Sequence, residues 1–291
     1  MSPSNSPAIS VRELRKGYPD KVLGTKWAVD GVTFEIAYGE IFAILGPNGA
    51  GKTTTVEILE GYRRRDSGEV KVLDMDPQEL SSDELHWRNR IGIVLQSASD
   101  AGDLSVRETI SHFAHYYTNP KSPEEVIDSV GLREKADAKI RTLSGGQRRR
   151  LDVALGIIGS PEILFLDEPT TGFDPEARRD FWELIRSLKA LGTTIVLTTH
   201  YLDEAEALAD RVAVIADGKI IEIATPSTLG KRNEAKARVA WLEDGSTQII
   251  ETEHPTQEVA KLAERFNGEV PELSVTRPSL EDIYLQMIGH S

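Results

Sequence analysis

The chain has 291 residues, which is enough for one large domain and a second, small one. Its formal net charge of −13 argues against nucleic acid as the main partner, because binding to a phosphate backbone needs a basic surface. The absence of cysteine excludes disulfides and thiol chemistry and is compatible with a reducing, cytosolic setting. Neither a secretory signal nor an apolar run that could span a bilayer is visible, so we expect a soluble protein or a soluble subunit of a larger assembly.

Residues 1–7 are rich in Ser and Pro and are expected to be disordered. Residues 9–14 predict a first strand, and the alternation of apolar and polar residues over 29–36 predicts a half-buried second strand. Tyr18 is expected in the loop between them. The residue alone leaves two interpretations open, an aromatic that stacks on a bound base such as adenine and a tyrosine that packs on a hairpin.

Residues 46–53, GPNGAGKT, fit G-x-x-x-x-G-K-[ST], the phosphate-binding loop. A buried strand is predicted before the loop at 41–44, and a helix after it at 54–60. The alternative interpretation is a glycine-rich turn beside a surface lysine, and this strand–loop–helix context disfavours it. The glycines let backbone N–H groups curl around phosphate oxygens, and the helix adds its positive N-terminal end. Lys52 can reach the β- and γ-phosphates, and Thr53 can offer its hydroxyl to Mg²⁺. The expected phosphate site consists of Gly46, Pro47, Asn48, Gly49, Ala50, Gly51, Lys52, Thr53 and Thr54.

Strands are predicted at 69–73 and 91–95, with a short helix at 84–90 between them, and the second strand ends at Gln96. A glutamine at the carboxyl end of a strand in an α/β sheet lies where ligands bind. Its amide could complete the coordination of a metal or hold an attacking water. The alternative is a solvated cap of the strand.

Helical patterns replace strand signals from about residue 103 to about residue 160. One helix is predicted over 104–117, and a second over 123–130 with Ser122 as its N-cap and Gly131 as its end. The sequence therefore predicts a helical insertion between strands of the sheet. Its aromatic-rich first helix could be a docking face, or the aromatic residues could form a plain core stripe.

Residues 143–147, LSGGQ, begin another helix within this insertion. Ser144 can cap the helix, and the glycine pair that follows leaves the first amides uncovered. This predicts a second anion site at a helix N-terminus. Three arginines follow at 148–150, which we interpret as a solvated helix face or as groups that hold acidic neighbours.

A buried strand is predicted over 163–166, and it ends in Asp167 and Glu168. Asp167 can hold the shell of a Mg²⁺ ion, and Glu168 can polarise an attacking water. Loops often begin with such a pair, so the functional interpretation depends on the phosphate loop and on LSGGQ. A long helix is then predicted to begin at Pro175, and a buried strand at 194–197 is followed by His200.

His200 falls at the edge of the sheet that also carries Gln96 and Asp167, where it could contact a γ-phosphate. A lone histidine at a strand end would ordinarily be structural or exposed. Further along, strands at 211–215 and 219–224 flank Asp217-Gly218, a strong hairpin signal. From about residue 233 we expect a small α+β appendage without a catalytic constellation, so the predicted domains are 8–232 and 233–291.

The phosphate loop, Gln96, LSGGQ, ILFLDE at 163–168 and His200, in this order, resemble the ATP-binding cassette (ABC) ATPases over about residues 8–230. The phosphate loop alone indicates only an NTPase. LSGGQ placed before the Asp-Glu strand is specific to this superfamily, which includes relatives in chromosome maintenance and DNA repair. The resemblance implies an α/β P-loop NTPase core with an antiparallel β subdomain and an inserted α-helical subdomain, and it implies ATP and Mg²⁺ as ligands.

The resemblance also assigns roles to residues. Tyr18 fits the aromatic that stacks on adenine, Gln96 fits the Q-loop residue, and His200 fits the switch histidine. Asp174 lies in the D-loop, which reads TTGFDP rather than SALD. Glu168, His200 and Gln96 are the expected catalytic residues, and Thr53, Gln96 and Asp167 the expected metal ligands. The signature motif comprises Leu143, Ser144, Gly145, Gly146 and Gln147.

The closing segment PSLEDIYLQMIG at 278–289, with AVDGVTFEI and EGYRRRDSGEV, resembles the daunorubicin-resistance type of cassette subunit. That type pairs with separate integral-membrane permeases of the ABC-2 kind. The resemblance implies a peripheral protein at the cytoplasmic face of the cell membrane that powers export of a drug, antibiotic or lipid-like compound.

In this family two cassettes face head to tail, and each nucleotide lies between the phosphate loop of one and the LSGGQ helix of the other. The resemblance therefore implies an ATP-bound homodimer. One alternative is a soluble cassette protein that acts on ribosomes or nucleic acid, which the single cassette, the lack of a long heptad run and the acidic charge disfavour. A second is an importer ATPase with a regulatory tail, which the closing segment disfavours.

Overall fold

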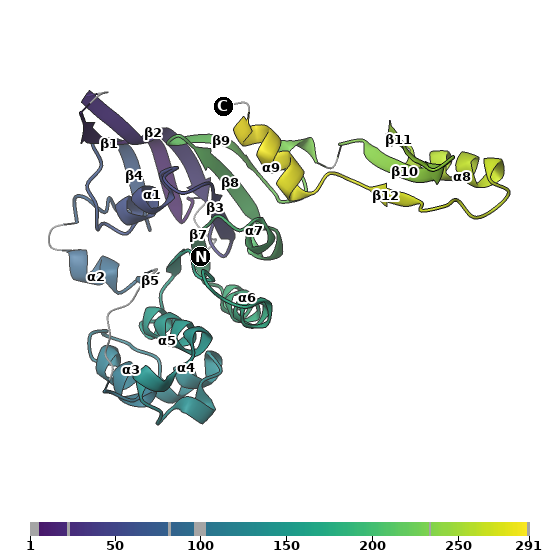
Figure 1. The fold of residues 1–291 in the computed structure, drawn as a ribbon. Helices are drawn as coiled ribbons and strands as arrows, with labels where there is room; N and C mark the ends of the chain where they lie inside the picture. The colour runs from purple at the N-terminus through teal and green to yellow at the C-terminus, as the bar shows by residue number, and fades with distance from the viewer. Residues whose placement is uncertain (1–5, 22–23, 81–82, 96–102, 233, 290–291) are drawn as a thin grey trace. The chain divides into compact units, whose positions relative to one another are not determined.

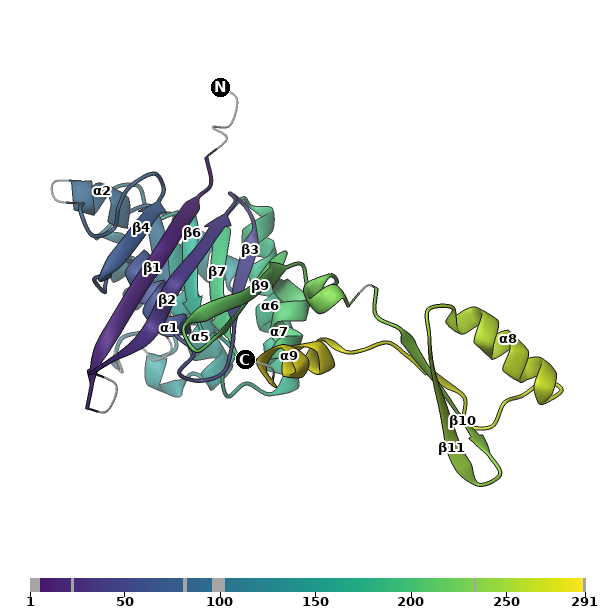
Figure 2. The ribbon, with the colours of Figure 1, turned by 90° about the horizontal axis from the view of Figure 1, so that it is seen from above.

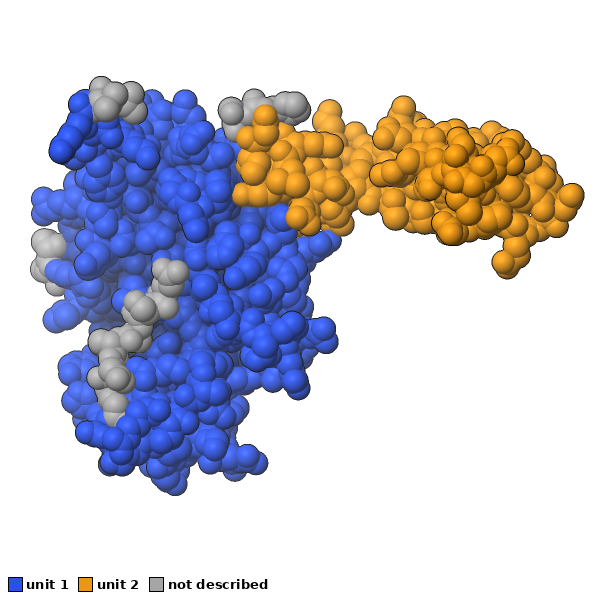
Figure 3. Space-filling view, viewed as in Figure 1, with its two compact units in different colours: residues 1–221 blue, residues 222–291 orange. Residues whose placement is uncertain are grey.

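Residues 6–21, 24–80, 83–95, 103–232 and 234–289 are described here from a computed structural model. The chain forms two compact units, residues 1–221 and 222–291 (Figure 3). The boundary between the units falls within strand β9, whereas the sequence predicts the start of the accessory domain further along, after residue 232. The predicted disorder of residues 1–7 falls mostly outside the described residues.

The first unit is built around a six-stranded sheet in the order β5-β6-β7-β3-β8-β9 (Figure 1). The pairs β5–β6, β6–β7, β7–β3 and β3–β8 are parallel. Strands β3, β6, β7 and β8 are mostly apolar and almost wholly buried, as in parallel sheets that are covered on both faces. The strands are Ile41–Leu45 (β3), Ile91–Val94 (β5), Ile163–Asp167 (β6), Thr194–Thr199 (β7), Arg211–Ala216 (β8) and Lys219–Ala224 (β9). The sequence predicts all of them.

A second sheet of this unit is antiparallel and has the order β2-β1-β4 (Figure 2). Its strands are Ile9–Asp20 (β1), Gly24–Ile36 (β2) and Ser67–Val72 (β4). The prediction that the first strand ends at residue 14 and that Tyr18 lies in a loop is wrong, because β1 continues and pairs Tyr18 with Lys26 of β2. The second half of β1 lacks an alternation of apolar and polar residues, and backbone hydrogen bonds to β2 hold it in the sheet. Glu13, at φ 49°, lies at an irregularity near the middle of β1, where the register of the pairing shifts.

Four helices belong to the core of the first unit: Lys52–Leu59 (α1), Glu84–Arg88 (α2), Pro175–Ala190 (α6) and Leu202–Leu208 (α7). Helix α1 begins directly after the glycine-rich loop that follows β3. Helix α6 begins where the sequence predicts, with Pro175 at its first position and Asp174 as its N-cap. Because β3, β5, β6 and β7 are parallel, their carboxyl ends lie at one edge of the sheet.

The described residues from 103 to 160 form no strand and carry Val106–Ala114 (α3), Pro123–Ser129 (α4) and Gly145–Ile157 (α5) (Figure 1). Helix α3 is shorter than the predicted 104–117, and Ser105 caps it in a reciprocal capping box with Glu108. Ser122 is the N-cap of α4 as predicted, although its side chain makes no capping hydrogen bond.

The second unit holds a three-stranded antiparallel sheet in the order β11-β10-β12. Its elements are Ala237–Glu243 (β10), Ser246–Thr252 (β11), Pro255–Arg265 (α8), Ser274–Thr276 (β12) and Leu280–Gly289 (α9). Asp244 and Gly245, both at positive φ, form the turn between β10 and β11. The sequence does not predict β12, which is too short to show an alternation.

Candidate active site

The glycine-rich loop joins the buried strand β3 to α1, as its motif requires. Two of its glycines are needed for the loop to pack against its neighbours. A Cβ on Gly46 would lie 2.3 Å from the carbonyl oxygen of Ile215, and one on Gly51, at φ 105°, would lie 2.1 Å from that of Ala28. The loop can therefore hold its position beside β2 and β8 only with glycine at these positions.

Lys52, the first residue of α1, is a buried cation with a relative exposure of 4%. Its Nζ donates to the carbonyl oxygens of Gly46 (2.9 Å) and Pro47 (3.2 Å) and lies 3.3 Å from Oε1 of Glu168. Every one of these partners is an oxygen atom. Phosphate oxygens are suitable replacements for such partners, so the geometry suits the binding of a polyphosphate.

A cleft of about 550 Å³ opens beside the loop. It brings Tyr18 together with the phosphate loop and Glu168, although Tyr18 lies in a strand rather than a loop. The cations of Lys16 and Arg63 lie 5.8 Å and 5.5 Å from the centre of the Tyr18 ring. The residues that line the cleft are Tyr18, Lys26, Ala28, Asn48, Gly49, Gly51, Lys52, Thr53, Thr54 and Glu168.

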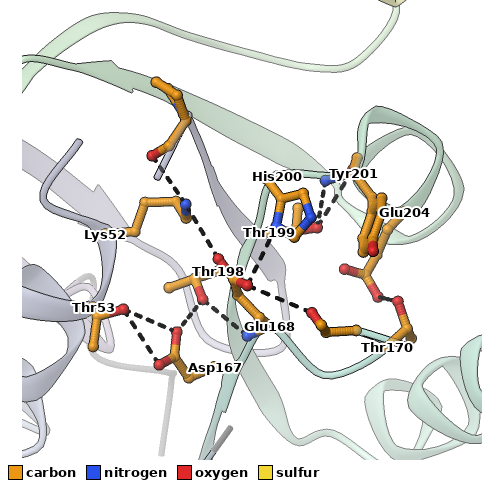
Figure 4. A network of polar contacts seen from close by, with 12 residues as sticks. Lys52, Thr53, Asp167, Glu168, Thr170, Thr198, Thr199, His200, Tyr201 and Glu204 are labelled. Atoms are coloured by element: carbon orange, nitrogen blue, oxygen red, sulfur yellow. Dashed lines mark hydrogen bonds and ion pairs between the residues drawn. The ribbon is translucent and has the colours of Figure 1, made fainter. Parts of the chain in front are cut away.

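Thr53, which lines this cleft, contacts Asp167 (Figure 4). The Thr53 hydroxyl lies 3.4 Å and 3.3 Å from the two carboxylate oxygens of Asp167. Thr198, at the end of β7, donates its own hydroxyl to Oδ1 of Asp167. A hydroxyl and a carboxylate are the hard oxygen donors that Mg²⁺ prefers, so this pair fits the expected metal.

Glu168 follows β6 in a left-handed conformation, at φ 42°. Its backbone N–H donates to the carbonyl oxygen (3.2 Å) and the hydroxyl (3.0 Å) of Thr198. Its carboxylate lies 3.3 Å from Lys52 Nζ and 3.3 Å from Nδ1 of His200 (Figure 4). The structure thus brings together a carboxylate, an ammonium group and an imidazole from three distant parts of the chain. A positive φ at a residue other than glycine costs energy and is often found at functional sites.

The LSGGQ segment begins α5 with a reciprocal capping box. Ser144 Oγ accepts from the N–H of Gln147 at 3.3 Å, and Gln147 Oε1 accepts from the N–H of Ser144 at 3.1 Å. A Cβ on Gly145 would meet nothing within 4 Å, so the start of the helix is open. Among the described residues that line the cleft beside Lys52, none belongs to 143–147.

Asp174 and Gln96 are the two remaining residues of the predicted site. Asp174 caps α6, and its Oδ1 accepts from the N–H groups of Glu176 (3.0 Å) and Ala177 (2.8 Å). Gln96 lies outside the described residues.

The sequence does not predict the role of Thr198 or the burial of Arg149. Thr198 contacts both Asp167 and Glu168, yet its only sequence signal is its place two residues before His200. Arg148 and Arg150 lie near the carboxylates of Asp152 and Asp180, as one of the two interpretations of 148–150 expects. A solvated face is wrong for Arg149, which is only 6% exposed. Its guanidinium donates mainly to backbone carbonyl groups, and burial lowers its pKa. The apolar pattern of α5 gives no sign of this.

Two more buried carboxyls lie behind the site. Glu60, at the end of α1, is 4% exposed, and its burial, with the charges of Asp167 and Glu57, raises its pKa to about 8. Glu204 in α7 is fully buried, which raises its pKa. Glu204 accepts a hydrogen bond from the Thr170 hydroxyl at 2.9 Å and so ties the loop after Glu168 to α7 (Figure 4).

Comparison with known proteins agrees with this geometry. The family model described as "ABC transporter" matches residues 29–171. The chain is 36% identical to the Nod factor export ATP-binding protein I of Burkholderia orbicola, over 97% of each chain. It is 37% identical to the daunorubicin/doxorubicin resistance ATP-binding protein DrrA of Streptomyces peucetius, over 93% of this chain and 90% of the relative.

Among solved structures, the chain is similar to a dimeric post-hydrolysis state of the ATP-binding cassette MJ0796 bound to ADP and Pi. The TM-score is 0.66 at 26% identity, over 75% of this chain and 98% of that one. The glycine-rich loop, the capped LSGGQ helix and the Asp-Glu strand end lie in the part of the chain that these proteins share. The chain therefore belongs to the ABC transporter family, as one of its ATP-binding and ATP-hydrolysing subunits.

Proposed function

We propose that this chain powers export of a drug, antibiotic or lipid-like compound through a separate permease of the ABC-2 type, at the cytoplasmic face of the cell membrane. The two relatives named above are named for Nod factor export and for daunorubicin/doxorubicin resistance, and their similarity extends over nearly the whole chain. The resemblance of residues 278–289 to the drug-resistance type of subunit supports the same direction of transport. Within the described residues, every helix is too short or too polar to cross a bilayer.

The observation that carries the dimeric mechanism is the separation of the two anion-binding helix ends. Lys52 and Glu168 line the cleft, whereas the open start of α5 at Ser144 does not. A second copy of the chain can supply that helix end, as in the head-to-tail dimers of the family. The dimeric structure of MJ0796 with ADP and Pi supports this arrangement.

Within each complete site, Lys52 balances the charge of the phosphates and Glu168 orients or activates the attacking water. His200, held 3.3 Å from Glu168, contacts the γ-phosphate. Thr53 and Asp167 would hold Mg²⁺, with Gln96 as a further ligand. The bound ion would neutralise the negative charge that develops on the phosphate oxygens. Tyr18, which lines the cleft, stacks on the adenine ring.

A second, mainly apolar hollow of about 780 Å³ lies between β5 and the helical region, and we assign it to a cytoplasmic segment of the permease. It is lined from α2, β5, α3 and α5, and several of its apolar side chains are exposed. Phe113, Tyr116, Leu85 and Leu95 have relative exposures of 37%, 68%, 77% and 57%. An ATPase subunit of a transporter needs such a contact, because the conformational change that accompanies ATP binding and hydrolysis must reach the protein that spans the membrane.

Affinity purification from membranes tests this proposal. The full chain is expected to co-purify with a polytopic membrane protein, and Tyr116→Glu should reduce its recovery at least about tenfold because a charge would be buried in the contact. The matched control is Tyr62→Glu, since Tyr62 is 79% exposed and lies outside the hollow. Recovery with ribosomes or nucleic acid, and without a membrane protein, would instead support the soluble alternative.

A further inference from the structure

Arg149 lies on the signature helix α5, yet its guanidinium contacts the segment that carries Glu168 in the same chain. It donates to the carbonyl oxygens of Asp167 (3.0 Å) and Pro169 (3.0 Å), the two residues that flank Glu168. A third donor of the same group bonds the carbonyl oxygen of Leu95, just after β5. One buried side chain therefore joins the end of β6 to the end of β5 through three carbonyl groups.

These bonds surround a residue whose backbone needs support. Glu168 has φ 42°, a conformation that costs about 1–3 kcal/mol for a residue other than glycine unless its surroundings fix it. Thr198 holds the N–H of Glu168, and Arg149 holds the carbonyl groups before and after it. Together they set where the carboxylate of Glu168 lies relative to Lys52 and His200.

The charge of Arg149 is not explained by an ordinary salt bridge. The carboxylate of Asp152 lies 3.9 Å away, at the limit of an ion pair, while the side chain of Arg149 is 7% exposed. Burying a cation is costly, and the dipoles of three carbonyl groups offset that cost together with the charges of Asp152, Asp167 and Glu204. Arginine suits this task because its planar group carries several donors in fixed directions, whereas lysine offers a single nitrogen.

We infer that Arg149 is a positioning residue for ATP hydrolysis, which fixes the backbone on both sides of Glu168 from the helix that begins with LSGGQ. This inference rests on the proposed role of Glu168. It also gives a physical link between the two half-sites of one chain: a displacement of α5 on contact with a partner's nucleotide is transmitted to Glu168 through a single guanidinium.

The test compares Arg149→Lys and Arg149→Met with the adjacent Arg148→Lys as a matched control on the same helix. Arg149→Lys is expected to lower kcat for ATP hydrolysis by about 10- to 100-fold, because small misplacements of a catalytic group have effects of this order. The KM for ATP should change less than about twofold, since the phosphate loop is untouched. Arg149→Met should lower kcat further, and Arg148→Lys should leave it unchanged.

A double variant separates positioning from general damage. If Arg149 acts through Glu168, then Arg149→Lys should cause no further loss of the residual rate in a Glu168→Gln background. Equal proportional losses in both backgrounds, or a kcat of Arg149→Lys within twofold of the wild type, would overturn the inference while leaving Glu168 as the catalytic residue. If Glu168→Gln alone hydrolyses ATP at the normal rate, the proposed role of Glu168 fails, and the inference about Arg149 fails with it. If Arg149→Met does not fold, the inference is still tested by Arg149→Lys, which keeps the positive charge.

Discussion

Lys52 shows how a single residue couples the loop to the rest of the site. Its amine is surrounded by two loop carbonyl oxygens and by the Glu168 carboxylate, and it is almost fully buried. The motif identifies this lysine from sequence, but the ion pair with Glu168 joins residues that are more than a hundred positions apart. A bound triphosphate would compete with Glu168 for Lys52, so phosphate binding and the placement of the Glu168 carboxylate are linked through one cation.

Glu60 provides a prediction at the same scale. Its ordinary pKa of 4.5 applies to the unfolded chain, whereas the pKa in the folded chain is about 8. The folded state binds this proton more tightly, so the stabilisation is fully present below pH 4.5 and is lost as the pH rises through about 8. Glu60→Gln cannot ionise, so its free energy of unfolding relative to the wild type should rise between about pH 5 and pH 8.

Denaturant unfolding of both proteins across this pH range measures the difference. Glu84→Gln serves as the control, because Glu84 is about half exposed in a surface pair with Arg88. A gap between wild type and Glu60→Gln that stays constant from the acidic to the basic end would contradict the assignment.

At the scale of elements, the hairpin β8–β9 supports the phosphate loop. Gly218 in its turn donates its N–H to the carbonyl oxygen of Ala50 (3.1 Å) and accepts from the N–H of Asp30 (2.8 Å). The turn thereby joins the loop to β2, and its left-handed residues make this approach possible. An element that looks like a plain connection in the sequence is thus part of the frame of the nucleotide site.

Gly218→Ala should therefore destabilise the protein by roughly 2 kcal/mol or more, because φ 77° is unfavourable for alanine and the new Cβ would lie 3.0 Å from the carbonyl oxygen of Ala28. The KM for ATP should also rise, since the loop loses its support. Gly39→Ala is the matched control: φ is 73° there, but a Cβ would meet nothing within 4 Å. Equal losses of stability in the two variants, with KM unchanged in both, would show that the contact with the loop is unimportant.

At the scale of the whole molecule, the proposed mechanism requires two copies of the chain. The cleft is lined by the phosphate loop and Glu168, and the open start of α5 does not line it. In the proposed dimer, closed symmetry between two copies would complete both sites at once, which would make hydrolysis dependent on association.

Mixing two inactive variants tests this dependence. Lys52→Ala lacks the phosphate cation, and Ser144→Arg blocks the start of α5. In a mixed dimer one site carries both defects and the other carries neither, so an equal mixture should regain up to roughly a quarter of the wild-type ATPase rate. Each variant alone should stay inactive, as should a mixture of Lys52→Ala with a Lys52→Ala/Ser144→Arg double variant. A mixture that stays inactive although mixed dimers form would place both half-sites in the same chain.

The sequence by itself determined the order and type of most elements and the residues of the phosphate loop. This was possible because buried parallel strands are continuous apolar runs, and because a loop that wraps phosphate needs glycine at fixed spacing. Asp167, Glu168 and His200 could also be placed at one edge, since parallel strands end on the same side of a sheet. The extension of β1 through Tyr18 could not, because a polar hairpin continues by backbone pairing that leaves no side-chain pattern.

Only the tertiary structure decided what Arg149, Thr198, Glu60 and Glu204 do. Each is a polar residue whose position depends on partners from distant segments, and a periodic pattern along one helix or strand does not carry that information. The same limit explains why the sequence left two interpretations of 148–150 open, a solvated face and groups that hold acidic neighbours. Three arginines in a row have the same chemistry, and the burial of one of them depends on how α5 packs against the sheet edge. The sequence determines the chemical type of each side chain, whereas the free-energy cost of burying a charge depends on the neighbours that folding brings to it.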